Sequence, residues 1–474
     1  MNRTWLISFA MLLTLQLSSQ TAYRIDVTLK PFHSGYLYLA HHYGKKQILV
    51  DSAAIDNNSK AVFTGKTKLP GGIYMIAFPK KDGWFEIVID KEQNFTIVGD
   101  SSDLLNKLVF TGSADNQLFK DYQKFTAKTG GEINGLQKSL AGAKTKQDSA
   151  EIQKAIQAGS KSLTAYRQQF IKDHPKHLLT SIFSVLNETQ IPSSIKDSVA
   201  IYYYYRRHYW DGVNLTDARL IRTPVLQPKL DRYFDDVLPQ EPDTLKEEAY
   251  DIILKARADK DMYQYFLSQL TDKYVNPRYM GQDAVFVYLF QKFYVTGEAD
   301  EWMSEKYKKF IFDRGYSLMA NILGDKAANI VMADTLDKPK PLYSVDAAYT
   351  LVCFWDPGCS HCQVEVPKLD SLYKAKWKSK GVIIYGVMTS GGKDAWLKYI
   401  HEHNLKDWVH VYQTEEMKSA ENASGKPGYK QLFDVYQTPM LYLLDKDKRI
   451  VAKKLNYEQL NEFMDYKLTS ARTN

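Results

Sequence analysis

The pattern of hydrophobic and polar residues changes character twice along the 474-residue chain. Residues 23–112 hold short stretches rich in strand-forming residues, including an alternating run at 23–29 and apolar runs at 35–40 and 84–89. Turn-forming residues separate these stretches, as at Pro70-Gly71-Gly72. Short strands at this spacing are typical of a small β-sandwich or barrel, so the first part of the chain is expected to be all-β.

Residues 113–325 follow a helical period instead. One helix is expected to begin near Pro242, where Thr244 and Glu247 have the spacing of a capping box. Three other stretches have apolar residues on one helical face, which predicts a mostly α-helical region. These stretches are 148–169, 261–274 and 283–295.

An aromatic and basic run at 202–210 stands out within this helical region. Interleaved tyrosine and arginine side chains can bind a polymer or a glycan. On a helix, however, such residues are more often half-buried with their polar ends in water. The packing interpretation is therefore favoured over a binding surface.

From residue 326 onwards, strand and helix patterns alternate. The run 382–387 is continuously apolar, as a buried central strand requires, and so is most of 349–355. The order is β-α-β followed by a β-hairpin and a last helix. The other expected elements are a helix from 363 to about 380, a helix at 394–403, a strand at 409–412, hairpin strands at 438–444 and 449–452, and a helix at 457–468.

Composition limits the possible functions. A chain of this length is expected to form several domains. There are 62 basic and 55 acidic side chains, so the net charge is +7. The basic residues are spread along the chain rather than clustered, which argues against nucleic-acid binding.

The N-terminus has the pattern of a secretory signal peptide. Arg3 precedes an apolar core at 6–15, and small and polar residues follow up to Ala22. Residues 1–22 are therefore expected to direct export to the periplasm. An uncleaved N-terminal membrane anchor remains the alternative, and no later stretch is long and apolar enough to span a bilayer.

The three cysteines, Cys353, Cys359 and Cys362, all lie in one short segment. A secreted protein with structural disulfides would distribute them along the chain, so these cysteines are expected to serve a site. Cys359 and Cys362 are separated by two residues at a strand-to-helix junction, the arrangement of a dithiol redox site. The free N–H groups of the helix start favour a thiolate at the first cysteine, and the second can attack the mixed disulfide that the first one forms.

Four motifs give the C-terminal part of the chain a family resemblance. They are Phe354-Trp355, Cys359-Ser360-His361-Cys362, Glu365-Val366-Pro367 and Thr438-Pro439. With these motifs, residues from about 330 to 474, within an expected domain at 326–474, resemble TlpA/ResA-type thiol–disulfide oxidoreductases, which are exported bacterial members of the thioredoxin superfamily. The preceding parts resemble uncharacterised β-rich and helical regions of other exported proteins. The expected fold is multidomain, with residues 23–112 all-β, residues 113–325 mostly α and a C-terminal α/β thioredoxin domain.

The resemblance implies a role for each matching residue. Cys359 would be the exposed nucleophile and Cys362 the buried resolving thiol. Pro439 would be a cis-proline whose loop, with Thr438, faces the substrate. Two further residues would support the site: Trp355 by packing beside it and Pro367 by kinking the helix.

His361, Glu365 and Cys353 concern the redox tendency and proton transfer. An imidazole between the two cysteines can stabilise the Cys359 thiolate and make the disulfide more oxidising, which predicts a redox role for His361. Where relatives carry Asn or a buried acid, this chain has Cys353, which cannot act as a carboxylate base. We hypothesise that Glu365 or a water molecule accepts the proton instead, with Cys353 a buried strand residue.

Rival functions are less consistent with these residues. A peroxidase of this fold needs Thr or Ser three residues before its cysteine, where this chain has Asp356. A copper chaperone of this fold would use a wider cysteine spacing. The adjacent His41 and His42 point to opposite faces of a strand, so they cannot share one metal ion and no metal site is expected.

The expected partners are protein thiols or disulfides and a membrane electron donor, with no organic cofactor. The open alternative is a binding protein whose N-terminal domains are the functional module.

Overall fold

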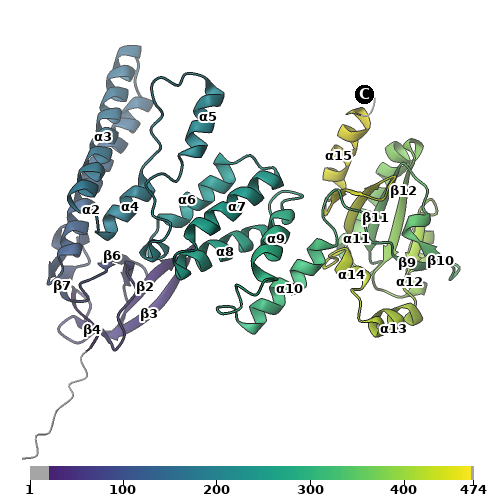
Figure 1. Cartoon of the computed structure of the whole chain (residues 1–474), viewed down its shortest axis with the longest axis horizontal. Helices are drawn as coiled ribbons and strands as arrows, with labels where there is room; N and C mark the ends of the chain where they lie inside the picture. Colours follow the sequence, from purple (N-terminus) through teal and green to yellow (C-terminus); the bar gives the residue numbers. More distant parts are fainter. Residues whose placement is uncertain (1–20, 471–474) are drawn as a thin grey trace, which may run out of the picture. The chain divides into compact units, whose positions relative to one another are not determined.

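The computed structural model describes residues 21–470, and the chain divides into two compact units at Val237 and Leu238. Figure 1 shows strands and helices in the first unit and helices followed by an α/β layer in the second. The multidomain fold class expected from the sequence is confirmed, while its boundaries at 112 and 325 remain predictions. The signal-peptide prediction falls almost entirely on residues 1–20, outside the described part. Among the described helices, none combines the length and apolar character needed to cross a membrane.

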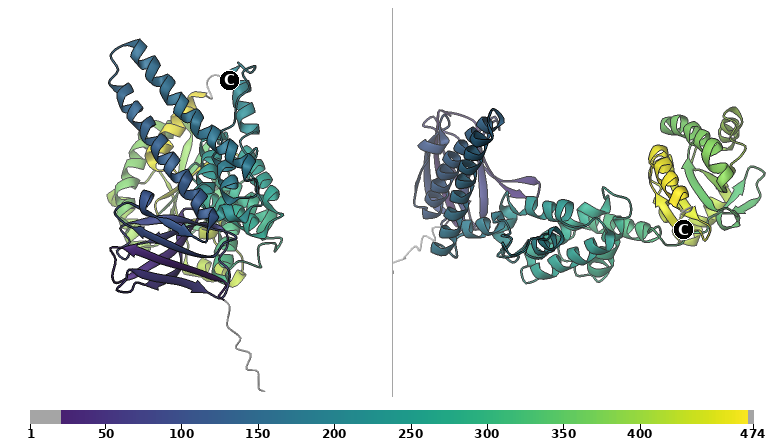
Figure 2. Two further views of the ribbon diagram at one scale, coloured as in Figure 1. Left: turned by 90° about the vertical axis from the view of Figure 1, so that its left-hand side faces the viewer. Right: turned by 90° about the horizontal axis from the view of Figure 1, so that it is seen from above.

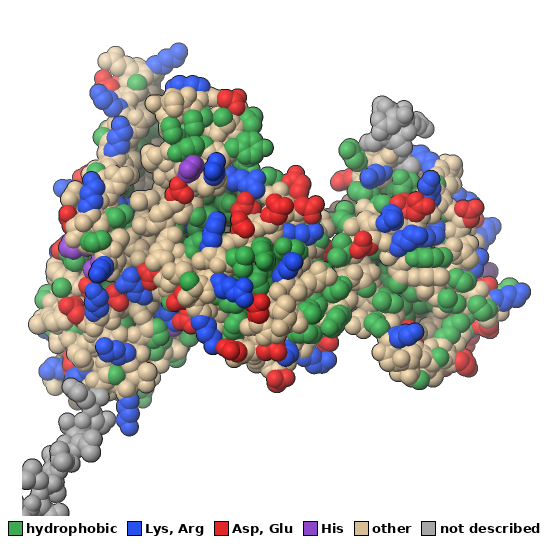
Figure 3. Space-filling model, in the orientation of Figure 1, with side chains coloured by type: hydrophobic (Ala, Val, Ile, Leu, Met, Phe, Trp, Pro, Cys, Tyr) green, Lys and Arg blue, Asp and Glu red, His purple; other side chains and the backbone are tan. Residues whose placement is uncertain are grey.

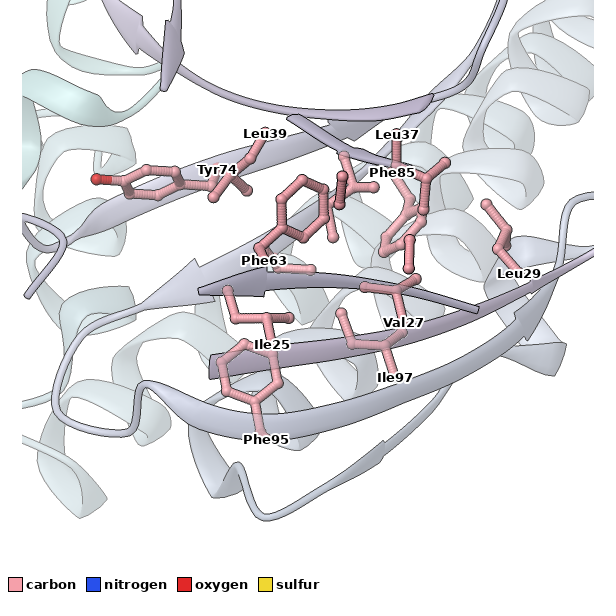
Figure 4. Close-up of a cluster of buried hydrophobic side chains, with 14 of the residues drawn as sticks. Ile25, Val27, Leu29, Leu37, Leu39, Phe63, Tyr74, Phe85, Phe95 and Ile97 are labelled. Atoms are coloured by element: carbon pink, nitrogen blue, oxygen red, sulfur yellow. The ribbon is translucent and has the colours of Figure 1, made fainter. Parts of the chain in front are cut away.

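The first unit begins with two four-stranded sheets that pack as a sandwich. Strand β1 (Tyr23–Lys30) alternates buried and more exposed residues, as its sequence predicts. Its inward side chains, including Ile25 and Val27, meet residues of the other sheet such as Phe85 (Figure 4). One sheet has the order β4 (Lys60–Gly65), β1, β7 (Asn94–Asp100), β8 (Val109–Thr111), and the other β3 (Lys46–Ala54), β2 (Tyr36–Tyr43), β5 (Gly72–Ala77), β6 (Trp84–Ile89).

Two long helices follow the sandwich and form a hairpin. Both α2 (Ala114–Ala141) and α3 (Lys146–Asp173) begin with a hydroxyl cap, Ser113 and Thr145, that accepts a hydrogen bond from a first-turn N–H. Figure 2 shows the two helices side by side. The other helices of this unit are α1 (Leu104–Lys107), α4 (Leu178–Leu186), α5 (Ser198–Arg207), η1 (Ala218–Arg222), α6 (Leu226–Arg232) and η2 (Tyr233–Val237).

The aromatic run at 202–210 begins on α5 and is mostly half-buried. The hydroxyl of Tyr202 donates to the Val237 carbonyl at 3.1 Å, and that of Tyr205 to Glu188 at 3.1 Å. Tyr203, with 59% of its surface exposed, and Arg207 are exposed, whereas Tyr209 is buried. Packing therefore describes most of the run, although the hydroxyls of Tyr202 and Tyr205 bond to protein groups rather than to water.

The second unit opens with four helices. The capping box predicted at Thr244 and Glu247 is wrong, because the helix already begins at Pro242 and Thr244 lies inside its first turn. Proline fits this first position since its fixed φ is helical and it lacks an N–H that would go unpaired there. The helices are α7 (Pro242–Ala256), α8 (Lys260–Val275), α9 (Asp283–Leu289) with its π-helical continuation η3 (Phe290–Tyr294), and α10 (Glu305–Met319).

Gly315 on α10 allows a close approach between helices. A Cβ at this position would lie 2.6 Å from the ring of Phe290. Although alanine favours a helix, we expect Gly315→Ala to destabilise the second unit by about 1–3 kcal/mol through overpacking. Gly135 on α2 has no atom within 4 Å of its Cβ position, so Gly135→Ala should stabilise by about 0.5–1 kcal/mol. Urea unfolding of both variants measures the two effects, and equal shifts would contradict the packing argument.

The rest of the second unit is a seven-stranded sheet with helices on both faces. Strand β11 (Tyr349–Trp355) lies inside the sheet, parallel to β12 (Val382–Met388) and antiparallel to β14 (Met440–Asp445). The full order is β10 (Pro339–Pro341), β9 (Val331–Asp334), β13 (Val409–Tyr412), β12, β11, β14, β15 (Ile450–Lys453). The β-α-β and hairpin order expected from the sequence is confirmed.

Both faces of this sheet are buried. Side chains of β11 alternate between two apolar cores, with Cys353 and Trp355 in one and Val352 and Phe354 in the other. This explains why the strand reads as a continuous apolar run. The helices are α11 (Ser360–Leu372) with η5 (Tyr373–Trp377) and η6 (Lys378–Lys380), α12 (Lys393–Glu402), α13 (Glu415–Ser424), α14 (Tyr429–Leu432) and α15 (Tyr457–Ser470), and η4 (Leu342–Ser344) precedes β11.

Candidate redox site

The site lies where β11 ends and α11 begins. Cys359 is the residue preceding the first turn of α11, in extended conformation. The turn before it is held by Asp356, which accepts a hydrogen bond from the Gly358 N–H at 2.7 Å and another from the Ser390 hydroxyl. The side-chain amide N–H of Gln363 donates to the Pro357 carbonyl at 3.2 Å. These bonds fix the backbone that presents Cys359.

Cys359 is a partly exposed thiol beside the loop before β14. Its Sγ lies 3.4 Å from the carbonyl oxygen of Thr438, to which the thiol can donate. Partial burial opposes ionisation, but hydrogen bonds from the Thr438 side chain, the Cys362 thiol and the N–H groups of Cys362 and His361 favour the thiolate and outweigh it. The pKa of Cys359 is therefore lowered from its usual value, which favours a reactive thiolate.

Cys362 has the opposite character. It is fully buried in the first turn of α11, and the Asp356 N–H points at its Sγ from 3.5 Å. Burial raises the pKa of Cys362 to about 12. The lowered pKa of Cys359 favours its thiolate, which is the nucleophilic form, whereas Cys362 stays protonated near neutral pH.

Cys353 lies behind this pair. It is fully buried in the middle of β11, and burial raises its pKa well above the usual value, with the nearby Cys362 and Glu365 adding to the effect. A thiol in these surroundings stays protonated. The structure therefore places Cys353 as a buried strand residue close to the redox pair.

The loop before β14 faces Cys359. The peptide bond between Thr438 and Pro439 is cis, and β14 pairs with β11 so that Met440 lies opposite Phe354. This register brings the Thr438 carbonyl, which belongs to a residue far along the chain, to the start of α11. Thr438 and Pro439 are thus brought together with the cysteines.

The remaining predicted residues lie around the pair. The imidazole of His361 is exposed, and the backbone N–H of this residue helps to lower the pKa of Cys359. Glu365 is half-buried on α11, and Pro367 lies inside the same helix. Trp355 is fully buried, with its ring 5.2 Å from that of Tyr399.

Asp356, Ser390 and Tyr399 contribute to the site but were not singled out from the sequence for these roles. Burial raises the pKa of Tyr399, and the nearby Cys362 adds to it. Tyr399 lies on α12 and Ser390 in the loop before it, and neither belongs to a motif. From the sequence, a tyrosine at an apolar helix position is expected to be an ordinary core residue. Only the folded structure places Tyr399 near Cys362.

The opposite pKa shifts predict separate reactivities with an alkylating reagent. In the reduced protein, Cys359 should react with iodoacetamide at a pH below that needed by an unperturbed cysteine, because its thiolate forms earlier. Cys362 should stay unmodified through neutral pH, since its pKa is about 12. Mass spectrometry after timed alkylation across mildly acidic to mildly basic pH checks this. In urea the two cysteines should titrate alike, and identical profiles in the folded protein would contradict the assignment.

Comparisons with known proteins cover most of the chain in separate parts. Residues 23–119 match a family described as a domain of unknown function (DUF4369), and residues 142–314 match another (DUF5106). The thiol-disulfide oxidoreductase ResA of Bacillus cereus is 25% identical over 143 residues, covering 30% of this chain and 75% of that protein. ResA of Bacillus anthracis is 24% identical with the same coverage.

Solved structures were also found. A thioredoxin-like protein from Bacteroides caccae aligns with TM-score 0.47 and 22% identity, covering 59% of this chain and 98% of its own. A domain of a possible thiol-disulfide isomerase from Cytophaga hutchinsonii has TM-score 0.28 and 35% identity, covering 32% of this chain and 97% of its own. The ResA relatives confirm the family resemblance predicted from the sequence and support an oxidoreductase activity.

Proposed function

Since the C-terminal part of the chain is homologous to thiol–disulfide oxidoreductases, we propose that this protein exchanges disulfides with other proteins through Cys359 and Cys362. The observation that carries the proposal is the contrast between the two thiols. Cys359 is partly exposed with a lowered pKa, whereas Cys362 is buried with its pKa raised to about 12. A dithiol needs this asymmetry in order to attack first with one sulfur and release product with the other.

The reaction proceeds in two balanced steps. The Cys359 thiolate attacks one sulfur of a substrate disulfide, and the other substrate sulfur leaves as a thiolate that takes up a proton. Cys362 then loses its proton and attacks Cys359 Sγ, which releases the second substrate thiol. The substrate gains two electrons, and the protein is left with a Cys359–Cys362 disulfide.

Thr438, Pro439, His361 and Glu365 have supporting roles in this proposal. The loop of Thr438 and Pro439 lies within 3.4 Å of the attacking sulfur and offers backbone to a bound peptide. Trp355 and Pro367 shape the core and helix behind the pair. Glu365, half-buried near Cys353, or a water molecule takes the proton of Cys362. The His361 N–H helps to stabilise the thiolate, and its exposed imidazole adds positive charge when protonated.

The favoured direction is reduction of protein disulfides in the periplasm. The support is the signal-peptide pattern at 1–22 together with the ResA resemblance. In this direction a membrane electron donor regenerates the reduced pair. The reverse reaction, in which the protein oxidises thiols, uses the same two steps backwards.

The reduction potential of the pair tests both the chemistry and the direction. The full chain is equilibrated against glutathione buffers, and alkylated thiols are counted by intact mass. A value near about −270 mV supports a reductase, and one near about −120 mV reverses the direction. If no disulfide forms between Cys359 and Cys362 at any potential, the redox proposal fails.

A second candidate is a binding protein whose N-terminal domains are the functional module. The edge strand β3 favours it, because its consecutive Ile48, Leu49 and Val50 are exposed by 40%, 60% and 37%. An exposed apolar edge strand is a surface to which another chain can pair. Undiminished function in the cell after loss of both redox cysteines would favour this candidate.

A further inference from the structure

A cavity of about 400 Å³ lies in the second unit beside the loop that faces Cys359. One wall is the connection between α8 and α9, with Arg278, Tyr279 and Met280. The opposite wall carries Tyr436, from the loop before β14, and Lys454, which follows β15. The cavity therefore combines residues of the helical layer with residues of the α/β layer.

The cavity is close enough to the cysteines to be reached by a bound peptide. Tyr436 precedes Thr438 by two residues, so their Cα atoms are at most about 7 Å apart. The Thr438 carbonyl is 3.4 Å from Cys359 Sγ. An extended chain covers about 3.3 Å per residue, so residues two to four positions from a reacting cysteine lie about 7–13 Å from it, and the farther of them reach the Tyr436 side of the cavity.

Asp283, which lines the cavity, has a carboxylate oxygen without a hydrogen-bond partner in the described part of the chain. Asp283 is 4% exposed, and its Oδ2 accepts from the Lys453 amino group at 2.6 Å. The other oxygen, Oδ1, is buried and has no partner among the described residues. The amino group of Lys453 is not available to a ligand, because it also donates to Asn321 O at 2.6 Å and to Asn321 Oδ1 at 3.0 Å. A ligand with an N–H donor would satisfy Asp283.

The rim of the cavity is positively charged. Arg278 is exposed, lies over its own neighbour Tyr279 at 5.2 Å from the ring centroid, and forms no ion pair with any described carboxylate. Lys454 is paired with Asp434, which also binds Arg314. Around the cavity the cations thus outnumber the carboxylates, and Arg278 is the one available to an anion.

The rim also exposes apolar surface. Tyr279, Met280 and Tyr436 are exposed by 47%, 36% and 62%. Tyrosine and methionine are enriched where proteins bind other chains. An inorganic anion would gain nothing from these side chains and would be repelled by Asp283, whereas a peptide supplies N–H donors, apolar contact and a carboxylate together.

Building on the proposed disulfide exchange, we infer that this cavity binds the polypeptide segment next to the reacting cysteine of a substrate protein. It selects segments with an acidic side chain two to four residues from that cysteine. The acidic side chain pairs with Arg278, a backbone N–H of the segment donates to Asp283, and the aromatic rings of Tyr279 and Tyr436 cover its apolar part. Arg278 and Tyr436 are thereby specificity-determining residues.

The test compares three capped cysteine peptides, each carrying an aromatic thiol on its cysteine as a chromophoric leaving group. They differ only at the positions two and three residues from the cysteine, which are Asp, Ala or Lys. The rate at which the reduced full chain releases the chromophore is measured. We expect the Asp peptide to react about fivefold faster than the Lys peptide, the size of effect an exposed ion pair gives.

Arg278→Glu should abolish or invert this preference. Lys446→Glu is the matched control, because it changes the net charge equally and lies in the exposed turn at the other end of β14. Retained preference in Lys446→Glu and its loss in Arg278→Glu support the inference. Equal rates for all three peptides, or equal effects of the two variants, overturn it while leaving disulfide exchange intact. If no peptide reacts with the wild-type chain, the proposed function fails as well.

Discussion

Replacing Cys359 with serine is expected to reduce disulfide exchange to the uncatalysed background, whereas Cys362→Ser will stop the reaction at a mixed disulfide with the substrate. The reason is the division of labour between the two sulfurs. A serine hydroxyl does not ionise near neutral pH, so the first variant lacks the nucleophile. The second retains Cys359, whose Sγ lies 3.4 Å from the Thr438 carbonyl oxygen, but lacks the buried thiol that resolves the complex.

Non-reducing electrophoresis and intact mass measure the trapped complex, with insulin or an oxidised peptide as substrate. Cys353→Ala is the control, since this thiol is fully buried and should not take part in exchange. It should turn over substrate without accumulating a complex. If Cys362→Ser turns over normally while Cys353→Ala does not, the pair has been assigned to the wrong cysteines.

Some of the molecule could be predicted from sequence because local pattern and tertiary role agree. Strand β11 reads as continuously apolar, and both of its faces are buried. The long helix expected at 148–169 is α3, where a helical period persists over many residues. The redox pair is recognisable for the same reason, since its spacing and its position at a helix start are both local properties.

Other features did not follow from the motifs in the sequence. The capping box at Thr244 and Glu247 fits the motif, but Pro242 starts the helix earlier. The backbone N–H of His361 helps to lower the pKa of Cys359, a contribution that the sequence did not suggest for this residue. The pairing of Asp283 with Lys453 joins two parts of the chain that no motif relates.

This pair is the basis of the second large prediction, which is that Asp283→Ala will destabilise the second unit by about 3–5 kcal/mol. The side chains of Asp283 and Lys453 are only 6% and 2% exposed, and their charged atoms are 2.6 Å apart. Removing the carboxylate leaves the Lys453 ammonium buried with only the two oxygens of Asn321 as acceptors. Burial already lowers the pKa of Lys453, so the unpaired charge is strongly disfavoured.

Urea unfolding followed by circular dichroism measures the loss. Asp313→Ala is the matched control, because Asp313 pairs with Lys309 on the surface of α10 with both side chains more than half exposed, and it should stay within about 0.5 kcal/mol of wild type. The double variant Asp283→Leu/Lys453→Met should recover part of the loss, since removing both charges leaves neither one unpaired. If Asp283→Ala lowers the free energy of unfolding no more than Asp313→Ala does, the buried ion pair does not hold the helical layer against the sheet.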